Sequence, residues 1–201
     1  MKKPEGSIIG IPNIIIFFEI PMELFLYRRW RKRLFRQIKE GKVLEVGIGT
    51  GKNLPYYPFI NNGIGIDLSE GMLKQARNSA SKKNIVLLQA DAQKLPFCDD
   101  TFNKVVATYV FCSVPDPVIG LSEIRRVLKP DGKLLMLEHV LPENNLLKKL
   151  FNKINPFVVK KSGVHINRKT GNNIKKAGFK ITKEVNFFST IFKYFEAEKN
   201  A

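Results

Sequence analysis

Short apolar runs alternate with amphipathic stretches from Lys42 onward, and this alternation predicts the fold. Val43–Val46 is such a run, with β-branched residues and glycines after it, which predicts a buried strand. Strands that alternate with helices form a parallel sheet with helices on both faces, so the pattern predicts a doubly wound α/β fold. Further strands are expected at residues 63–67, 84–89, 104–108 and 133–138, and helices at 69–81 and 117–128, the second burying Ile119, Leu121, Ile124, Val127 and Leu128.

The pattern changes after Pro142, where apolar residues recur at helical spacing. We expect residues 142–178 to form an insertion of helices and loops. Two final strands are predicted near residues 179–185 and 190–198. Lys129–Gly132 is expected to be a turn, because it combines proline, aspartate and glycine.

Residues 7–27 are strongly apolar, but Pro12, Glu19 and Pro21 interrupt them. The uninterrupted run is far shorter than the roughly 20 residues that cross a bilayer, and no small-residue cleavage site of a signal peptide follows. We therefore expect one or two short helices that lie against a surface. The aromatic side chains expected at a membrane there are Phe17, Phe18 and Phe25.

A cationic segment follows, in which Trp30, Leu34, Phe35 and Ile38 recur at helical spacing. Cations beside an aromatic and aliphatic face are typical of an amphipathic helix at a membrane interface. The alternative is a helix whose apolar face packs on the sheet while its cations are solvated. Both can hold together, since the apolar residues upstream exceed what one small domain needs. On the first interpretation, Trp30 and the cations Arg28, Arg29, Arg31 and Lys32 contact the membrane.

The composition narrows the possible partners. A net charge of +16 over 201 residues predicts attraction to an anionic surface such as acidic lipid or nucleic acid. Cys98 and Cys112 lack metal-ligand or redox spacing, which fits a reducing compartment, and Cys112 is expected to pack as a small apolar residue. His139 and His165 are the only histidines, so a histidine-rich metal site is excluded and we expect no metal.

Polar residues follow three successive predicted strands. A turn containing Gly47, Gly49 and Gly51 comes after the first strand, where glycine permits positive φ and close approach of a ligand. Asp67 ends the second strand, at the offset expected of a carboxylate that binds ribose hydroxyls. Asp91 follows the third. Since parallel strands end at one edge of the sheet, these groups are expected to meet over one ligand.

Four motifs, namely Glu45–Gly51, Gly65–Ser69, Gln89–Ala92 and Arg126–Gly132, together resemble the class I S-adenosylmethionine-dependent methyltransferases. The resemblance covers roughly residues 42–198. It implies a Rossmann-like, seven-stranded, mostly parallel sheet with one antiparallel strand, and S-adenosylmethionine as the cofactor.

The same resemblance implies roles for single residues. The glycine turn would hold the methionine part of the cofactor, Asp67 the ribose hydroxyls, and Asp91 with the Ala92 backbone the adenine edge. Leu68 and Met72 would pack on the adenine ring. The cofactor-binding residues expected in this way are Glu45, Gly47, Gly49, Thr50, Gly51, Asn53, Asp67, Leu68, Met72, Asp91, Ala92 and Thr108.

Other stretches are similar to narrower groups. Phe111–Pro117 and Leu137–Val140 resemble the branch with ubiquinone-type, thiol and phospholipid methyltransferases. Leu150–Val158, His165–Thr170 and Pro21–Glu23 resemble the bacterial phosphatidylethanolamine N-methyltransferases, which implies N-methylation of that lipid. The chain departs from many relatives at one place, because Ile15 and Ile16 stand where they carry a Tyr-Asp pair.

The expected catalytic residues are His139, which could accept or relay the amine proton, and Tyr109, which could steer the amine through its hydroxyl or ring. The alternatives are a structural histidine and a pocket wall. For the lipid phosphate we expect donors at the start of the helix that ends at Ala177, or else a solvated basic turn. These donors are His165, Asn167, Arg168 and Lys169.

Together these inferences predict a basic, membrane-contacting segment at residues 1–40 and a methyltransferase domain at 41–201. The expected partners are an anionic membrane surface and a phospholipid substrate, at the cytoplasmic face of the membrane. Methylation of a quinone or small thiol, of RNA, or a non-enzymatic binding role are the alternatives. Nucleic acid is not favoured, because strand four lacks an Asn/Asp-Pro-Pro-Tyr motif.

Overall fold

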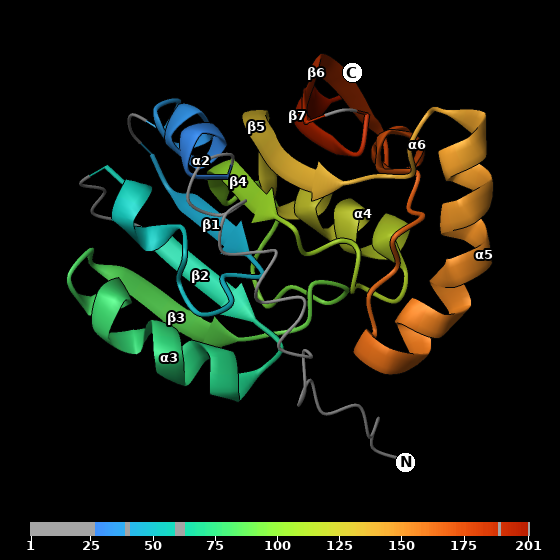
Figure 1. The fold of residues 1–201 in the computed structure, drawn as a ribbon. Coiled ribbons are helices and arrows are strands. Elements are labelled where there is room, and N and C mark those ends of the chain that lie inside the picture. The colour runs from blue at the N-terminus through green and yellow to red at the C-terminus, as the bar shows by residue number, and fades with distance from the viewer. Residues whose placement is uncertain (1–26, 39–40, 59–62, 189, 201) are drawn as a thin grey trace.

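The computed structural model describes residues 27–38, 41–58, 63–188 and 190–200. A seven-stranded sheet forms its centre, with the strand order β3-β2-β1-β4-β5-β7-β6 (Figure 1). Strand β7 runs antiparallel to both of its neighbours, and the other pairings are parallel. The strands are β1 (Val43–Val46), β2 (Gly63–Asp67), β3 (Ile85–Gln89), β4 (Phe102–Thr108), β5 (Leu128–His139), β6 (Phe179–Phe188) and β7 (Phe192–Lys199).

Helices cover both faces of the sheet, as the alternation in the sequence predicts. Alternate residues of one strand point to opposite faces, so Val105 and Val106 belong to different clusters of the core. One face packs against α4 (Pro117–Val127) and α6 (Thr170–Lys176), and the other against α2 (Arg28–Phe35) and α3 (Glu70–Ser81). The expected doubly wound α/β fold is therefore confirmed.

Residues 142–178, expected to form helices and loops, contain α5 (Asn145–Ser162), α6 and their connecting loops. Helix α5 lies outside the layers that cover the sheet (Figure 1). Asn144 caps it, since its side chain accepts from the backbone N–H groups of Leu146 and Leu147. Gly163 ends it in the left-handed conformation, with a φ of 72°.

Two local predictions differ from the structure. Lys129–Gly132 was expected to be a turn but lies within β5, where the pairing to β4 jumps from Phe102↔Leu128 to Lys104↔Lys133. The four residues form a bulge, so the strand continues through them. Ile119 was expected in the buried stripe of α4 together with Leu121, Ile124 and Val127; those three are buried, but Ile119 is 50% exposed.

Helix α2 packs against the core through its apolar face. Leu34, Phe35 and Ile38 are at most 2% exposed, and the Phe35 ring lies 4.5 Å from that of Tyr57. Trp30 is half-buried, with its ring 4.7 Å from that of Phe187. The structure therefore supports the interpretation in which the helix packs on the sheet, while contact of its exposed cations with a membrane stays a prediction.

The expected membrane contacts at Phe17, Phe18 and Phe25 lie outside the described residues. Of the cations, Arg28, Arg29 and Lys32 are exposed, but Arg31 is buried. Arg31 was expected at the membrane and lies elsewhere because it shares the inward face of the helix with Leu34 and Phe35, at offsets of three and four residues. Across the described part of the chain, every helix is too short or too polar to cross a bilayer.

Replacing Phe35 with alanine tests the packing of α2. We expect Phe35→Ala to lower the free energy of unfolding by about 3 kcal/mol, because it leaves a cavity beside Tyr57. Lys32→Ala, on the exposed face of the same helix, should change it by less than about 0.5 kcal/mol. Urea unfolding measures both values. A loss below about 1 kcal/mol for Phe35→Ala would show that α2 is not part of the core.

Candidate cofactor and acceptor site

The glycine turn after β1 forms a cradle that is open on one side. Gly47, Gly49 and Gly51 have positive φ values of 71°, 56° and 82°. A Cβ atom on Gly47 would lie 2.3 Å from Cγ2 of Val110, and one on Gly51 would lie 2.6 Å from Cδ1 of Leu54. A Cβ on Gly49 would meet nothing within 4 Å. The turn is thus packed on its inner side and leaves space for a ligand beside Gly49.

Asp67 ties the ends of β1 and β2 together. Its Oδ2 accepts from the backbone N–H of Gly49 at 2.9 Å, and its Oδ1 accepts from that of Ser69 at 2.8 Å. A carboxylate offers about four lone-pair positions, so the half-buried Asp67 keeps acceptor capacity for ligand hydroxyls. Beside it, Leu68 is 66% exposed and Met72 is half-buried in the first turn of α3.

The third strand end joins this edge as predicted. The backbone N–H of Ala90 donates to the carbonyl of Asp67 at 3.1 Å. Oδ1 of Asp91 accepts from the backbone N–H of Gln93 at 2.8 Å, and Oε1 of Gln93 accepts from the backbone N–H of Asp116 at 3.0 Å. Asp91 and Ala92 are half-buried. The bonds from Gly49 to Asp67 and from Ala90 to Asp67 bring the three strand ends together, as expected.

Glu45, Asn53 and Thr108, expected at the cofactor, form a buried network beneath the turn. Nδ2 of Asn53 donates to Oε1 of Glu45 at 2.6 Å and to Oγ1 of Thr108 at 2.8 Å. The hydroxyl of Tyr57 donates to Oε2 of Glu45 at 2.8 Å, and Arg31 donates to Oδ1 of Asn53. Burial raises the pKa of Glu45 to about 7. These residues hold the turn from below; Thr50, within it, is half-buried.

The sequence prediction missed two members of this network, Arg31 and Tyr57. A signal for Arg31 was present, since it has the same helical spacing as the apolar residues of α2. Tyr57 follows the short 3₁₀ helix η2 (Leu54–Tyr56), where a segment with two prolines gives no periodic signal.

Tyr109 and His139, the expected catalytic residues, belong to one aromatic cluster, which also contains Tyr27, Phe151 and Phe192. The Tyr109 ring lies 4.8 Å from that of Tyr27 and 6.2 Å from that of Phe192. The His139 ring lies 5.3 Å from Phe192 and is stacked at 5.8 Å on Phe151 of α5. The structure therefore brings the two residues together around Phe192.

Both residues have features that are typical of functional sites. Tyr109 has a φ of 56°, a left-handed conformation that is uncommon for a tyrosine. Burial lowers the pKa of His139 to about 4, so its imidazole is neutral at neutral pH. Among the described residues, Nδ1 of His139 has no hydrogen-bond partner. A neutral imidazole with a buried, unpartnered nitrogen can accept a hydrogen bond from a ligand.

Glu138 is a buried acid that the sequence prediction missed. Its Oε1 accepts from the backbone N–H groups of Val110 and Phe111, each at 3.2 Å, so it holds the loop that carries Tyr109. Burial raises its pKa to about 8. The available signal was an acid directly after the apolar run Leu134–Leu137.

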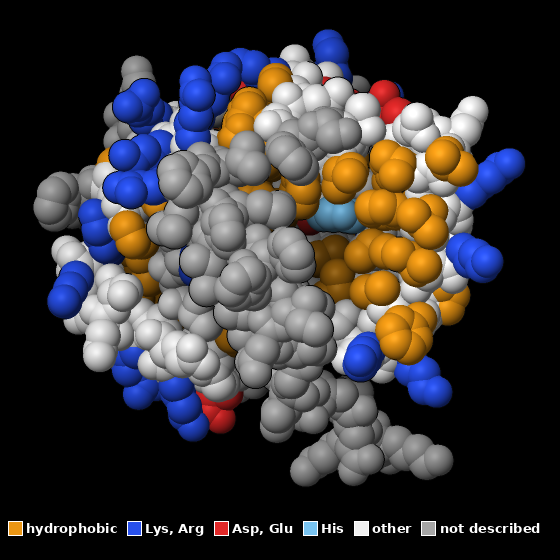
Figure 2. Space-filling view, viewed as in Figure 1, with side chains coloured by type: hydrophobic (Ala, Val, Ile, Leu, Met, Phe, Trp, Pro, Cys, Tyr) orange, Lys and Arg blue, Asp and Glu red, His pale blue; other side chains and the backbone are white. Residues whose placement is uncertain are grey.

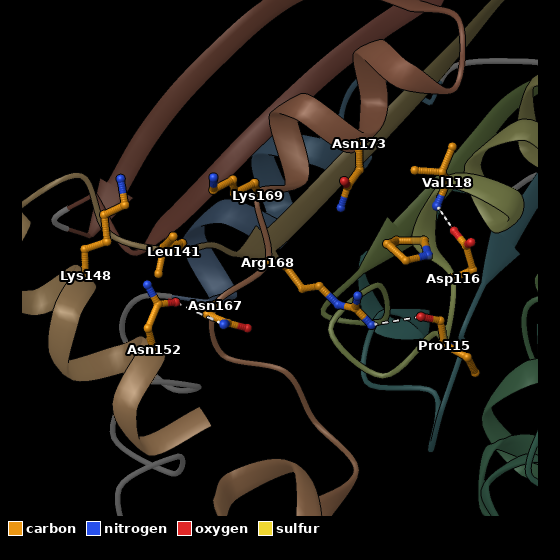
Figure 3. Close-up of a pocket in the computed structure, with 11 residues that line it drawn as sticks. Pro115, Asp116, Val118, Leu141, Lys148, Asn152, Asn167, Arg168, Lys169 and Asn173 are labelled. Carbon is orange, nitrogen blue, oxygen red and sulfur yellow. Dashed lines mark hydrogen bonds between the residues drawn. The ribbon is translucent and has the colours of Figure 1, made fainter. Parts of the chain in front are cut away.

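A polar cleft of about 570 Å³ lies beside this edge, between α5, α6 and the start of α4 (Figure 3). Of the expected phosphate donors, Asn167, Arg168 and Lys169 line it, together with Lys148, Asn152 and Asn173. His165 is half-buried and is not part of the lining.

The Arg168 guanidinium is hydrogen-bonded within the protein through one of its terminal nitrogens. One terminal nitrogen donates to the carbonyls of Val114 at 2.7 Å and Pro115 at 3.2 Å (Figure 3). Asn167 donates to Oδ1 of Asn152 at 3.0 Å, which links the α6 side of the cleft to α5. Lys169 is exposed. The cleft therefore combines hydrogen-bonded polar groups with the cations of Lys148, which is half-buried, and Lys169, which is exposed.

Cys112 is buried as expected, and burial raises the pKa of its thiol to about 12, which disfavours a thiolate nucleophile. Within the described ranges, no group of His, Cys, Asp or Glu side chains is arranged to hold a metal ion.

Comparisons with known proteins agree with this geometry. Residues 44–136 match the family model described as a methyltransferase domain. The crystal structure of YcgJ from Bacillus subtilis superposes with a TM-score of 0.70 at 19% identity, covering 87% of this chain and 99% of that one. The fold is that of the class I S-adenosylmethionine-dependent methyltransferases, which implies S-adenosylmethionine as the cofactor.

Two curated relatives match parts of the chain. The phosphatidylethanolamine N-methyltransferase of Cereibacter sphaeroides is 40% identical over 103 residues, 49% of this chain and 51% of that protein. The ubiquinone/menaquinone biosynthesis C-methyltransferase UbiE of Geobacter sulfurreducens is 34% identical over 139 residues, 62% of this chain and 53% of that protein. The chain thus spans about half the length of these relatives, and their substrates differ.

The two glycines of the turn should respond differently to alanine. Gly47→Ala places a methyl group against Val110 and should destabilise the fold by about 3 kcal/mol. Gly49→Ala should cost only about 1 kcal/mol of backbone strain but weaken S-adenosylmethionine binding roughly tenfold, because its methyl enters the open cradle. Urea unfolding and calorimetry measure the two effects. Unchanged affinity in Gly49→Ala would place the cofactor away from the turn.

Glu138 makes stability depend on pH. Its pKa is about 8 when folded, against 4.5 for an ordinary glutamate. Between these values the folded state keeps a proton that the unfolded state has lost, so this residue makes stability fall as pH rises, by up to about 1.4 kcal/mol per pH unit. Glu138→Gln should remove the contribution of this residue to the fall in the free energy of unfolding. Urea unfolding of both proteins from about pH 5 to about pH 8 checks it; parallel curves would contradict it.

Proposed function

We propose that the chain is an S-adenosylmethionine-dependent methyltransferase that N-methylates the ethanolamine head group of phosphatidylethanolamine at a membrane surface. One observation carries this proposal: the aromatic cluster and the cationic cleft are adjacent and share α5. Phe151 of that helix stacks on His139, while Lys148 and Asn152 line the cleft. An acceptor with an amine and a phosphate a few bonds apart matches this pair of environments.

The methyl transfer requires a neutral amine. When bound, S-adenosylmethionine supplies an electrophilic methyl group, and the new N–C bond forms as the C–S bond breaks, which leaves S-adenosylhomocysteine. An ammonium cannot attack, so the amine first gives its proton to water, and apolar surroundings lower its pKa and favour that loss. Ring faces at Tyr109 and Phe192 attract the ammonium as it enters.

His139 is best suited to orient the amine. With a pKa of about 4 it is a weak proton acceptor, but its unpartnered Nδ1 can accept a hydrogen bond from the N–H of the neutral amine. Such positioning of the lone pair toward the methyl group supplies much of the rate enhancement in displacement reactions. Glu138 fixes the loop after Tyr109 and so positions the opposite side of the cluster.

Quinone C-methylation is the second candidate. The match to UbiE supports it, and the stacked pair of His139 and Phe151 could accommodate a flat ring. A quinone has no phosphate, however, and gives the lysines of the cleft no role. The two candidates therefore differ in whether those cations matter.

Incubation with methyl-labelled S-adenosylmethionine tests the proposal. Vesicles containing phosphatidylethanolamine, vesicles containing a demethylated quinone, and RNA are offered in parallel. We expect label in mono-, di- or trimethylated lipid. Label only in the quinone or the RNA would contradict lipid methylation.

Variants of the cleft lysines distinguish phosphate recognition from a general effect of positive charge. The double variant Lys148→Glu, Lys169→Glu should raise the KM for phosphatidylethanolamine roughly tenfold or more, since it replaces two cations of the cleft with anions. Lys180→Glu, an exposed lysine of β6, is the control. Equal effects of the cleft and control variants, per charge changed, would show that the cleft does not bind the phosphate.

A further inference from the structure

Helix α5 exposes a continuous apolar stripe. Leu146, Leu150, Ile154 and Phe157 are 77%, 50%, 38% and 67% exposed. They are spaced by four, four and three residues, so they lie on one face of the helix. Figure 2 shows hydrophobic side chains gathered over this part of the molecule. We call these four residues the α5 stripe.

The α5 stripe differs from the other exposed apolar side chains. Leu68, in the loop after β2, and Ile119, on α4, are single residues, and Val86 and Leu88 are a pair on β3. Scattered apolar residues are normal on a protein surface, whereas a contiguous apolar patch marks an interaction site. The α5 stripe is therefore a candidate interaction site.

The charges around the stripe indicate what its occupant is. Lys149, Lys153, Lys160 and Lys161 are all exposed on the same helix, and Nζ of Lys161 lies 5.6 Å from the ring centre of Phe157. Residues 144–183 contain no Asp or Glu. An apolar face bordered by lysines fits the interface of an anionic bilayer, where apolar groups enter the acyl region and cations meet lipid phosphates.

Other occupants fit less well. A second copy of the chain would bring the same lysines together without an opposing acid on this helix. Nucleic acid would match the lysines but offers no apolar surface for the stripe. Helix α2 offers no comparable apolar stripe, because Leu34, Phe35 and the nearby Ile38 are already buried in the core.

The inward side of α5 connects the stripe to the site. Phe151 stacks on His139, and Lys148 and Asn152 line the cleft. The buried Asn155 accepts from the backbone N–H of Ile166 at 2.9 Å, which fastens the helix to the loop before α6. One helix thus carries an apolar outer face and a polar inner face beside the aromatic cluster.

We propose that the α5 stripe docks the protein on anionic lipid bilayers, with α5 lying in the interface. Docking in this way places the cleft at the level of the lipid head groups. The role of docking in substrate delivery rests on the proposed function, but the docking itself does not, and vesicles without substrate test it.

Binding of the full chain to vesicles of phosphatidylcholine with phosphatidylglycerol, and to phosphatidylcholine alone, is measured by co-sedimentation. Leu150→Glu and Phe157→Glu disrupt the stripe. Ile119→Glu is the matched control, because Ile119 is as exposed as Leu150, is also helical, and undergoes the same charge change. We expect the first two to weaken binding to the anionic vesicles at least tenfold, and the control to bind like the wild type. Thermal unfolding of each variant shows that it is folded.

Equal binding by all four proteins would overturn the proposal. So would RNA binding that Leu150→Glu abolishes and Ile119→Glu spares, if vesicles are not bound. Methylation of phosphatidylethanolamine is measured separately. If it is absent while stripe-dependent vesicle binding persists, the proposed function fails and the docking surface stands.

A local reporter separates the stripe from other membrane contacts. Trp30 is the only tryptophan, so the double variant Trp30→Phe, Phe157→Trp carries a single fluorophore in the stripe. We expect its emission to shift to the blue when anionic vesicles are added. Emission that is already blue-shifted without vesicles and does not move would show that this chain or a second copy covers the stripe, and would overturn the proposal.

Discussion

A buried carboxylate beneath the glycine turn joins the segments on which the site depends. Glu45 of β1 accepts from Asn53 and Tyr57, which flank η2, while Asn53 also donates to Thr108 at the end of β4 and accepts from Arg31 of α2. A buried polar group without partners costs about 1–3 kcal/mol, so these bonds constrain one another. The turn above them is consequently fixed before any ligand arrives, which reduces the ordering cost of binding.

The same arrangement recurs on the other side of the sheet edge. Glu138 is buried in β5 and accepts from two backbone N–H groups of the loop after Tyr109. One acid thus supports the glycine turn and another supports the loop after Tyr109. The strain of a left-handed tyrosine at position 109 is tolerated because the surrounding contacts determine its conformation.

Helices α2 and α5 have similar compositions, but α2 buries its apolar side and α5 leaves an apolar stripe exposed. Both combine aromatic or aliphatic residues with basic ones, mainly arginine in α2 and only lysine in α5. Helix α2 turns its apolar side to the core, where Phe35 meets Tyr57, and buries Arg31 with it. Helix α5 turns Phe151 and Asn155 inward and leaves its stripe exposed. The difference lies in what each helix packs against, and amphipathic spacing alone does not contain that information.

The sequence by itself determined the order of strands and helices along the chain and the meeting of Gly49, Asp67 and Asp91. These follow from local periodicity, from residue-specific backbone preferences, and from the rule that parallel strands end at one edge. Only the tertiary structure decided that Arg31 and Tyr57 support Glu45, that Lys129–Gly132 bulges within β5, and that the α5 stripe is uncovered. The physical reason is that periodicity shows that one face of a helix is apolar. Whether another segment packs on that face depends on contacts between residues far apart in the chain.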